Sequence, residues 1–126
     1  MYSNLSKFFI LLCLSSGGYA SAHELTPTYP ELRNSYIPGV LTTKLKMWNA
    51  RMDVEYYKIE VADENWNAVP FITDEVIFNL GYTERREIEV FLPVETSARY
   101  ICTRSMLKKE GRQKTVISSK VCSKIK

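Results

Sequence analysis

The 126-residue sequence contains one histidine and three cysteines, and this scarcity excludes most of the chemistry that catalytic sites require. Nucleophilic catalysis needs a serine or cysteine beside a base. The one imidazole, His23, lies in a segment, residues 23–30, that we expect to be loosely held. Paired carboxylates such as Glu87 and Glu89 lie two residues apart on a predicted strand. They therefore share its outward face, where we expect them to be solvated. We therefore expect no catalytic residues, no metal, no cofactor and no enzyme activity.

The sequence also lacks an apolar run long enough to cross a membrane. Its most apolar run, residues 8–14, follows Lys7 and gives way to small residues that end at Ala22. A spanning helix needs about 20 apolar residues, whereas a positive start, a short apolar run and a small-residue exit are typical of a secretory signal peptide. We predict that residues 1–22 are removed and that the protein is periplasmic or secreted. A retained anchor is the alternative.

Removal of the signal leaves two cysteines, Cys102 and Cys122, in a single domain at residues 23–126. A chain of this length supports one modest core. An even pair of cysteines in an oxidising compartment favours a disulfide. A metal site is the alternative. Apart from the two cysteines, however, the processed chain offers only His23 as an imidazole or thiolate ligand, and the two cysteines are not close in the sequence.

A helical stripe of apolar residues is absent from every window of about a dozen residues. Apolar and polar residues instead alternate with period two, as expected of strands that bury one face. Turn residues separate these segments at the spacing of a β-sandwich. We predict an all-β fold of about seven short strands. The alternating segments are residues 41–48, 57–61, 76–80, 86–92, 100–107 and 115–125, with a short piece at 69–71.

The last two predicted strands, residues 100–107 and 115–125, form a hairpin around a polar turn. Directly opposed residues can reach the Cα separation that a disulfide requires, more readily at a non-hydrogen-bonded pair. If Cys102 faces Cys122, the register of the hairpin follows. The opposed pairs are then Thr103 with Val121, Arg104 with Lys120, and Leu107 with Ile117.

This register sorts the hairpin into an apolar face and a basic face. The cysteines share the basic face, so the disulfide holds the hairpin without occupying its apolar side. The apolar set is Ile101, Leu107, Ile117, Val121 and Ile125, and the basic set is Arg104, Lys120 and Lys124. The apolar face has two interpretations, packing in the core of this chain and contact with a partner.

Charge is unevenly distributed along the chain. Residues 99–126 carry nine basic side chains and one acidic side chain, a net charge of +8, whereas residues 23–98 carry a net charge of −6. A basic C-terminal surface attracts anionic partners, although a solvated hairpin that resists aggregation explains the same charges. Nucleic acid is a poor candidate because no aromatic residues are interleaved with these charges. Trp48 and Trp66 are expected to cap the sandwich core rather than to form ligand platforms.

Several short motifs resemble the N-terminal immunoglobulin-like domain of periplasmic pilus-assembly chaperones. The likeness covers residues 31–126. It begins with Arg33-Asn34-Ser35-Tyr36-Ile37-Pro38-Gly39, followed by a strand that ends in Trp48-Asn49, and continues with the strand pair at residues 56–71, the alternating strand at residues 85–92 and Lys124-Ile125-Lys126 at the end. The resemblance implies an immunoglobulin-like β-sandwich.

The resemblance further implies that the C-terminal strand is an exposed edge that pairs with an incomplete pilin subunit. Ile117, Val121 and Ile125 would contact this client, and Arg33 and Lys126 match the two basic anchors that grip its terminal carboxylate. One branch of the family ties its last two strands with a disulfide, which Cys102 and Cys122 resemble. The family continues into a second domain after the position that Lys126 matches; from this sequence we expect no second domain and hence no interdomain cleft.

The leading hypothesis is an exported chaperone-like or pilus-assembly accessory domain that binds another exported protein through its C-terminal edge strand. Two alternatives belong to other classes. One is a structural surface component that assembles with copies of itself, and the other is a secreted binder of anionic surface polymers. None of the three requires nucleic acid or a stable membrane anchor.

Overall fold

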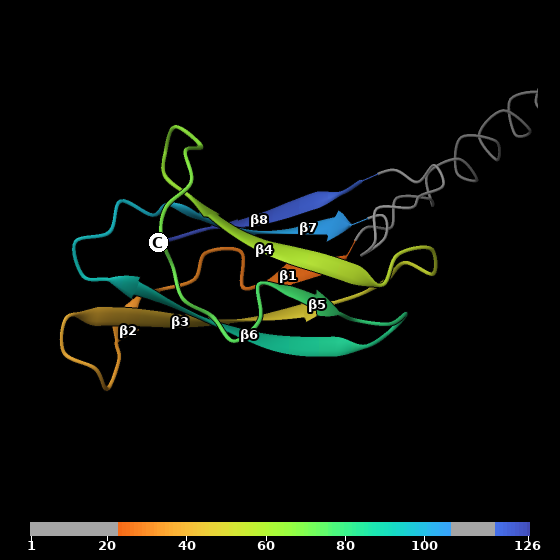
Figure 1. Cartoon of the computed structure of the whole chain (residues 1–126), viewed down its shortest axis with the longest axis horizontal. Coiled ribbons are helices and arrows are strands. Elements are labelled where there is room, and N and C mark those ends of the chain that lie inside the picture. Colours follow the sequence, from red (N-terminus) through yellow and green to blue (C-terminus); the bar gives the residue numbers. More distant parts are fainter. Residues whose placement is uncertain (1–22, 107–117) are drawn as a thin grey trace, which may run out of the picture.

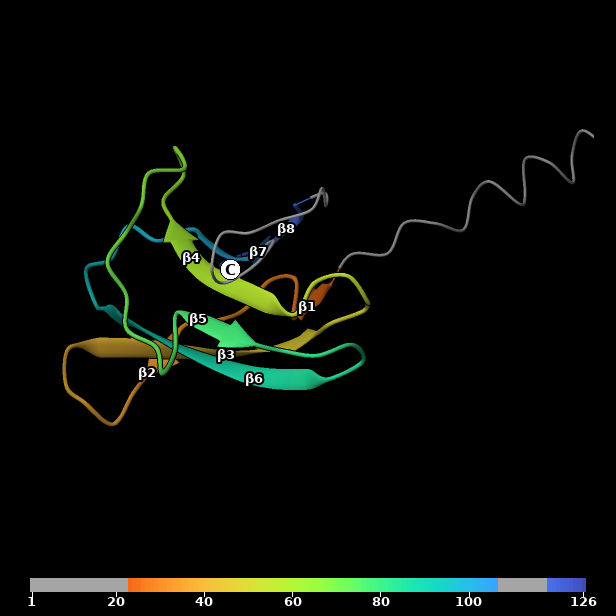
Figure 2. The ribbon, with the colours of Figure 1, turned by 45° about the vertical axis from the view of Figure 1, so that its right-hand side comes forward.

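The computed structural model describes residues 23–106 and 118–126, which form two antiparallel β-sheets packed face to face (Figures 1 and 2). The sheets contain eight strands where about seven were predicted: the two short N-terminal segments β1 and β2 also pair, whereas the predicted piece at residues 69–71 forms no strand. The strands are β1 (Glu24–Thr26), β2 (Arg33–Asn34), β3 (Val40–Trp48), β4 (Tyr56–Ala62), β5 (Ile77–Asn79), β6 (Arg85–Pro93), β7 (Tyr100–Met106) and β8 (Lys120–Lys124).

The first sheet is organised around β3. Strand β6 pairs along the whole of one edge of β3, from Val40 opposite Pro93 to Trp48 opposite Arg85. On the other edge of β3, β1 pairs with the last residues of β3, and β2 pairs with residues near the start of β3. The sheet is therefore built mostly from two long strands with alternating residues, which the sequence pattern predicted.

The second sheet has the strand order β5-β4-β7-β8, with all neighbours antiparallel. Between β4 and β5 the chain first forms a bridge at Ala62 with Ala68, and then reaches the first sheet through a bridge at Ile72 with Phe91. This segment crosses from the second sheet to the first before it returns at β5. At this crossing Val76 does not continue the buried face of β5, and it is 41% exposed. The expected strand at residues 76–80 is accordingly shortened.

The core lies between the two sheets and follows the predicted alternation. In β3, Leu45 and Met47 are buried, while Lys44 and Lys46 between them are exposed. The same period buries every second residue of β4 and β6, because successive side chains of a strand point to opposite faces. The buried apolar cluster is Leu25, Leu45, Met47, Val54, Tyr57, Ile59, Val61, Val69, Phe78, Leu80, Ile88, Val90, Leu92, Ile101 and Ile125.

The N-terminal segment corrects an expectation of the sequence analysis. Residues 23–30 are not loosely held, because β1 pairs with β3 and places Leu25 opposite Met47 in the core. Pro30 at the end of the segment is fully buried, and His23 at its start is only 3% exposed. The sequence did not indicate this strand because the segment is too short to show a period-two alternation of apolar residues.

Candidate functional site

The hairpin of β7 and β8 has the predicted register and disulfide. Cys102 and Cys122 are bonded, with their Cα atoms 4.0 Å apart. Backbone hydrogen bonds join odd-numbered partners, from Ile125 N to Arg99 O (2.7 Å) and from Ser105 N to Ser119 O (2.8 Å). The cysteines therefore occupy a non-hydrogen-bonded pair, where opposed Cα atoms come closest. The predicted pairing of Thr103 with Val121 and of Arg104 with Lys120 is confirmed, and that of Leu107 with Ile117 lies outside the described residues.

The apolar face of this hairpin points into the core. Ile101 and Ile125 are 1% and 5% exposed, and Val121 is half-buried against the same cluster. Ile117, another residue predicted to contact a partner, lies outside the described part of the chain. The hairpin thus packs against the core through Ile101 of β7 and through Ile125, which follows β8, while Val121 keeps part of its surface accessible.

The outer edge of β8 is only partly covered. The hydrogen bonds to β7 use odd-numbered residues, so the backbone groups of the even-numbered residues point away from it. The N–H groups of Lys124 and Lys126 donate to the carbonyl oxygens of Thr28 and Pro30, each at 2.9 Å. From the first hydrogen bond to the second, both the donor and the acceptor move two residues toward the C-terminus, so the two segments run parallel. Within residues 23–106 and 118–126, β8 is the last strand of its sheet. On the side away from β7, no backbone group of these residues pairs with Lys120 or Cys122, and β1 lies close to β8.

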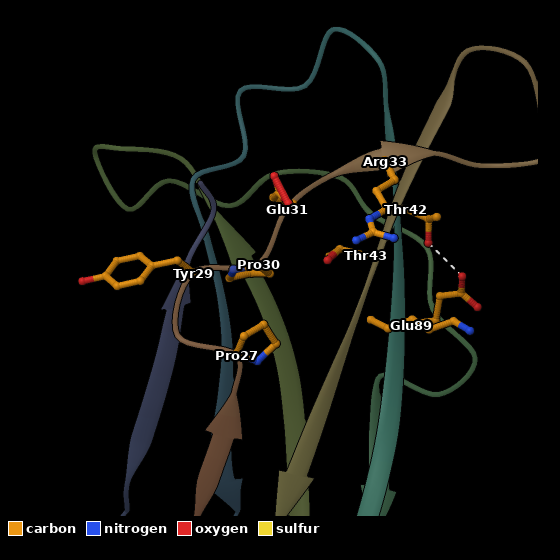
Figure 3. A pocket seen from close by; sticks show the side chains of 9 residues that line it. Pro27, Tyr29, Pro30, Glu31, Arg33, Thr42, Thr43 and Glu89 are labelled. Atoms are coloured by element: carbon orange, nitrogen blue, oxygen red, sulfur yellow. Dashed lines mark hydrogen bonds between the residues drawn. The ribbon is translucent and has the colours of Figure 1, made fainter.

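The two predicted anchors, Arg33 and Lys126, lie at the same end of the sandwich. Pro30 accepts the backbone hydrogen bond of Lys126 and precedes Arg33 by three residues, a span of at most about 11 Å in an extended chain. Arg33 is exposed on β2 and lines a groove of about 480 Å³. In Figure 3 its side chain extends from β2 toward Thr42 and Thr43.

The groove beside Arg33 has a balanced set of charges. Arg33 and Lys44 are its basic residues, and Glu31 and Glu89 are its acidic residues. Thr42 Oγ1 donates a hydrogen bond of 2.9 Å to Glu89 Oε2, which holds that carboxylate against β3 (Figure 3). A carboxylate ligand would therefore meet Arg33 in a groove without net formal charge.

A polar cluster around His23 was missed by the sequence analysis. His23 Nε2 lies 3.0 Å from Thr103 O and 2.8 Å from Thr103 Oγ1, and Nδ1 lies 3.3 Å from Ser119 Oγ. A carbonyl oxygen can only accept, so Nε2 carries the proton of a neutral imidazole. The Arg51 guanidinium also donates to Ser119 Oγ, at 3.3 Å, and binds Asp53. The imidazole thus joins the first residues of the described chain to β7 and to the start of β8.

The environment of His23 opposes its protonation. Burial lowers the pKa of His23 below its ordinary value of 6.5, and the nearby positive charge of Arg51 lowers that pKa further, whereas the hydrogen bond to Thr103 raises it. The edge of the His23 ring packs against Tyr57, with the ring centres 4.8 Å apart. Burial raises the pKa of Tyr57 to about 12, and its hydroxyl group donates to Asn49 Oδ1 at 2.6 Å. His23 and Tyr57 are therefore both favoured in their neutral forms.

Trp48 and Trp66 have different surroundings. The indole N–H of Trp48 donates to Thr83 O at 3.1 Å, which ties the end of β3 to the turn before β6. Trp66 does not cap the core, contrary to expectation. It is 52% exposed and stacks on Tyr100, with the ring centres 4.0 Å apart. The turn that carries Trp66 places the ring on the outer surface of the second sheet, which alternation alone could not indicate.

Two negative observations concern residues 23–106 and 118–126 alone. Within these ranges no three histidine, cysteine or acidic side chains are grouped so that they could hold a metal ion. No helix in the same ranges has the length and apolar character needed to cross a membrane.

Comparison with known proteins gives a likeness in structure only. No protein-family model and no curated protein sequence matches the chain. A crystal structure of the E. coli chaperone DraB matches with a TM-score of 0.62 and 17% identity, over 82% of this chain and 53% of that chain. A Salmonella enterica structure of SafA pilin in complex with the SafB chaperone matches with a TM-score of 0.61 and 12% identity, over 86% and 55%.

The chain spans about half the length of the chains it matches. At such low identities the likeness concerns the backbone arrangement and not the side chains that contact partners. The eight strands, the two antiparallel sheets and these neighbours together show that the protein has an all-β, immunoglobulin-like sandwich of the kind found in pilus chaperones.

Proposed function

We propose that this protein is an exported chaperone-like or pilus-assembly accessory domain that binds another exported protein by strand addition to β8. The observation that carries the proposal is the position of β8 at the end of its sheet, with backbone groups of Lys120 and Cys122 directed away from β7. Unpaired N–H and C=O groups on an edge strand form a ready template for another strand. The fold likeness to chaperones, one of them solved with a pilin, supports this role.

The geometry limits where the client strand can pair. The segment at Thr28 and Pro30 already occupies the edge at Lys124 and Lys126, so the incoming strand pairs before Lys124 unless it displaces that segment. Among the described residues, half-buried Val121 is the apolar side chain of β8 that we assign to client contact. We extend that assignment to Ile117, while Ile125 holds the strand to the core.

We propose that Arg33 and Lys126 bind a terminal carboxylate of the client. Both residues lie near Pro30 at one end of the sandwich, and Arg33 is exposed beside a groove. A guanidinium group binds a carboxylate through two parallel hydrogen bonds. Lys126 supplies a second positive charge at that end of β8. This pair would fix the position of the client along the strand.

Site-specific crosslinking tests the strand addition. A photoreactive residue at position 121 should capture an exported protein in cells that produce the neighbouring exported gene products. The same residue at Lys46, which is exposed on the first sheet, serves as the matched control. A specific adduct from position 121 alone supports the proposal. Recovery of only the monomer from both positions would count against it.

The self-assembling alternative predicts a different outcome in the same cells. A structural component should crosslink from position 121 to a second copy of this chain, and the purified protein should elute as oligomers during size-exclusion chromatography. A client-binding domain should elute as a monomer. Periplasmic location, which we propose with the chaperone role, is checked by fractionation and by the mass expected after cleavage at Ala22.

A further inference from the structure

The outward face of the second sheet contains a groove that the proposed client site does not use. Its volume is about 450 Å³, within the range of ligand pockets. The floor includes charged residues of β4, β7 and β8, and the turn at residues 63–67 forms one wall. This turn projects beyond the end of β4 in Figure 1. This outer-face groove has four charged lining residues, Lys58, Glu60, Arg104 and Lys120, and its other lining residues are apolar: Ile59, Val61, Ala62, Trp66, Ala68, Val69, Phe71 and Val76.

Trp66 has an unusual backbone conformation at the wall of the groove. Its φ of 64° lies in the left-handed region, which is a genuine outlier for a bulky residue and costs free energy that surrounding contacts must offset. The turn supplies those contacts, because Asp63 Oδ1 accepts hydrogen bonds from the N–H groups of Asn65 and Asn67, each at 2.9 Å. The planes of Trp66 and Tyr100 differ by only 10°. Tyr100 covers one face of the indole and Lys120 Nζ lies over the ring, so the surface of Trp66 open to a ligand is the remaining exposed half of the residue.

The charged residues of the groove are predominantly basic. Lys58, Arg104 and Lys120 line it together with one acidic residue, Glu60, which leaves a net charge of +2. Glu60 Oε1 lies 3.2 Å from Arg104 Nε and 3.9 Å from Lys120 Nζ. Arg104 uses its Nε for Glu60, and within residues 23–106 and 118–126 its Nη groups make no hydrogen bond, so they can donate to an anionic ligand. Lys120 Nζ also lies 5.1 Å from the centre of the Trp66 ring, which brings cation and aromatic surface together.

The position of the groove on the sheet restricts the ligands that it can bind. Strand β7 lies between β4 and β8, and β4 is paired along one edge with β7 and along the other with β5 over Tyr56–Lys58, so little edge is left there for a further strand. The side chains that the groove offers for recognition are the Trp66 indole, other apolar groups and three cations. We propose that the outer-face groove binds an acidic saccharide, whose ring packs on Trp66 and whose anionic group binds Arg104 and Lys120.

Tryptophan fluorescence tests this proposal directly. The chain has two tryptophans, so the purified Trp48→Phe protein reports on Trp66 alone. We expect a saturable change in emission with oligogalacturonate or with a sulfated oligosaccharide. A neutral malto-oligosaccharide and a glutamate peptide of equal length should bind at least about tenfold more weakly. The tighter of the two acidic saccharides identifies carboxylate or sulfate as the preferred group.

Matched variants separate a site from diffuse attraction. Lys120→Ala should weaken binding about tenfold, whereas Lys46→Ala removes the same charge from the other sheet and should leave affinity unchanged. Trp66→Ala should abolish binding measured by calorimetry, and Tyr82→Ala, which truncates an exposed aromatic elsewhere, should not. Circular dichroism verifies that each variant is folded. The proposal is overturned if neither acidic saccharide binds, if the glutamate peptide binds equally well, or if Lys46→Ala weakens binding as much as Lys120→Ala.

Discussion

The two faces of the second sheet differ in what surrounds their side chains, although the same strands supply both. The inner face of β7 places Ile101 and Thr103 against the core and the His23 imidazole. The outer face of β7 and β8 carries the disulfide, basic side chains and the stacked Trp66. The comparison teaches that the inner face contributes mainly to stability, and that the outer face and open edge are free to contact ligands.

The largest expected effect comes from the inner face. Ile101→Ala should lower the free energy of unfolding by about 2–5 kcal/mol, because it removes buried methyl groups and leaves a cavity. Lys124→Ala, on the exposed outer face of the same hairpin, should change it by less than about 0.5 kcal/mol. Urea unfolding measures both. Equal losses in the two variants would contradict the division between the faces.

The disulfide is the outer-face feature with the largest expected contribution to stability. Cys102 and Cys122 are 20 residues apart, and closing a loop of that length stabilises a protein by about 3 kcal/mol in the loop-entropy model. The double variant Cys102→Ala/Cys122→Ala should lose this amount in urea unfolding. Reduction of the unchanged protein, verified by mass analysis, should reproduce the loss. A variant as stable as the oxidised protein would show that core packing alone fixes the hairpin.

His23 provides the smallest effect and the one that depends on pH. The folded protein keeps His23 neutral, and the unfolded chain binds a proton near pH 6.5, so stability should fall as pH decreases below about 6.5 toward the lowered folded pKa. Unfolding measured between pH 7.5 and 5.5 should show this slope. His23→Gln should remove it, whatever its effect on absolute stability. An unchanged slope in that variant would assign the pH dependence to other groups.

The strands, the inward residues and the disulfide register could be predicted from the sequence for one physical reason. Side chains alternate across a strand, so residues such as Leu45 and Ile88 reveal their face by position alone. One assumed cysteine pair then fixed every other pair of the hairpin, including Thr103 with Val121. The same alternation failed at Val76, where the chain leaves one sheet for the other.

The His23 cluster and the outer-face groove could not be predicted because they join distant segments. His23 meets Thr103 and Ser119, which lie 80 and 96 residues away in the sequence. Trp66 has no period that would place it, and its ring reaches Tyr100 only because the turn projects beyond β4. The contact of residues 28–30 with the β8 edge also joins distant segments, and no local pattern in residues 28–30 indicates their partner.

The sequence by itself determined the strand content, the buried face of each long strand and the pairing of Cys102 with Cys122, because these depend on periodicity and on a single covalent constraint. Tertiary structure alone decided that His23 is buried, that Trp66 lies outside the core and that, among the described residues, Thr28 and Pro30 cover the β8 edge at Lys124 and Lys126. These features arise where segments far apart in the chain meet. Their contacts are set by the packing of two sheets, which local patterns do not encode.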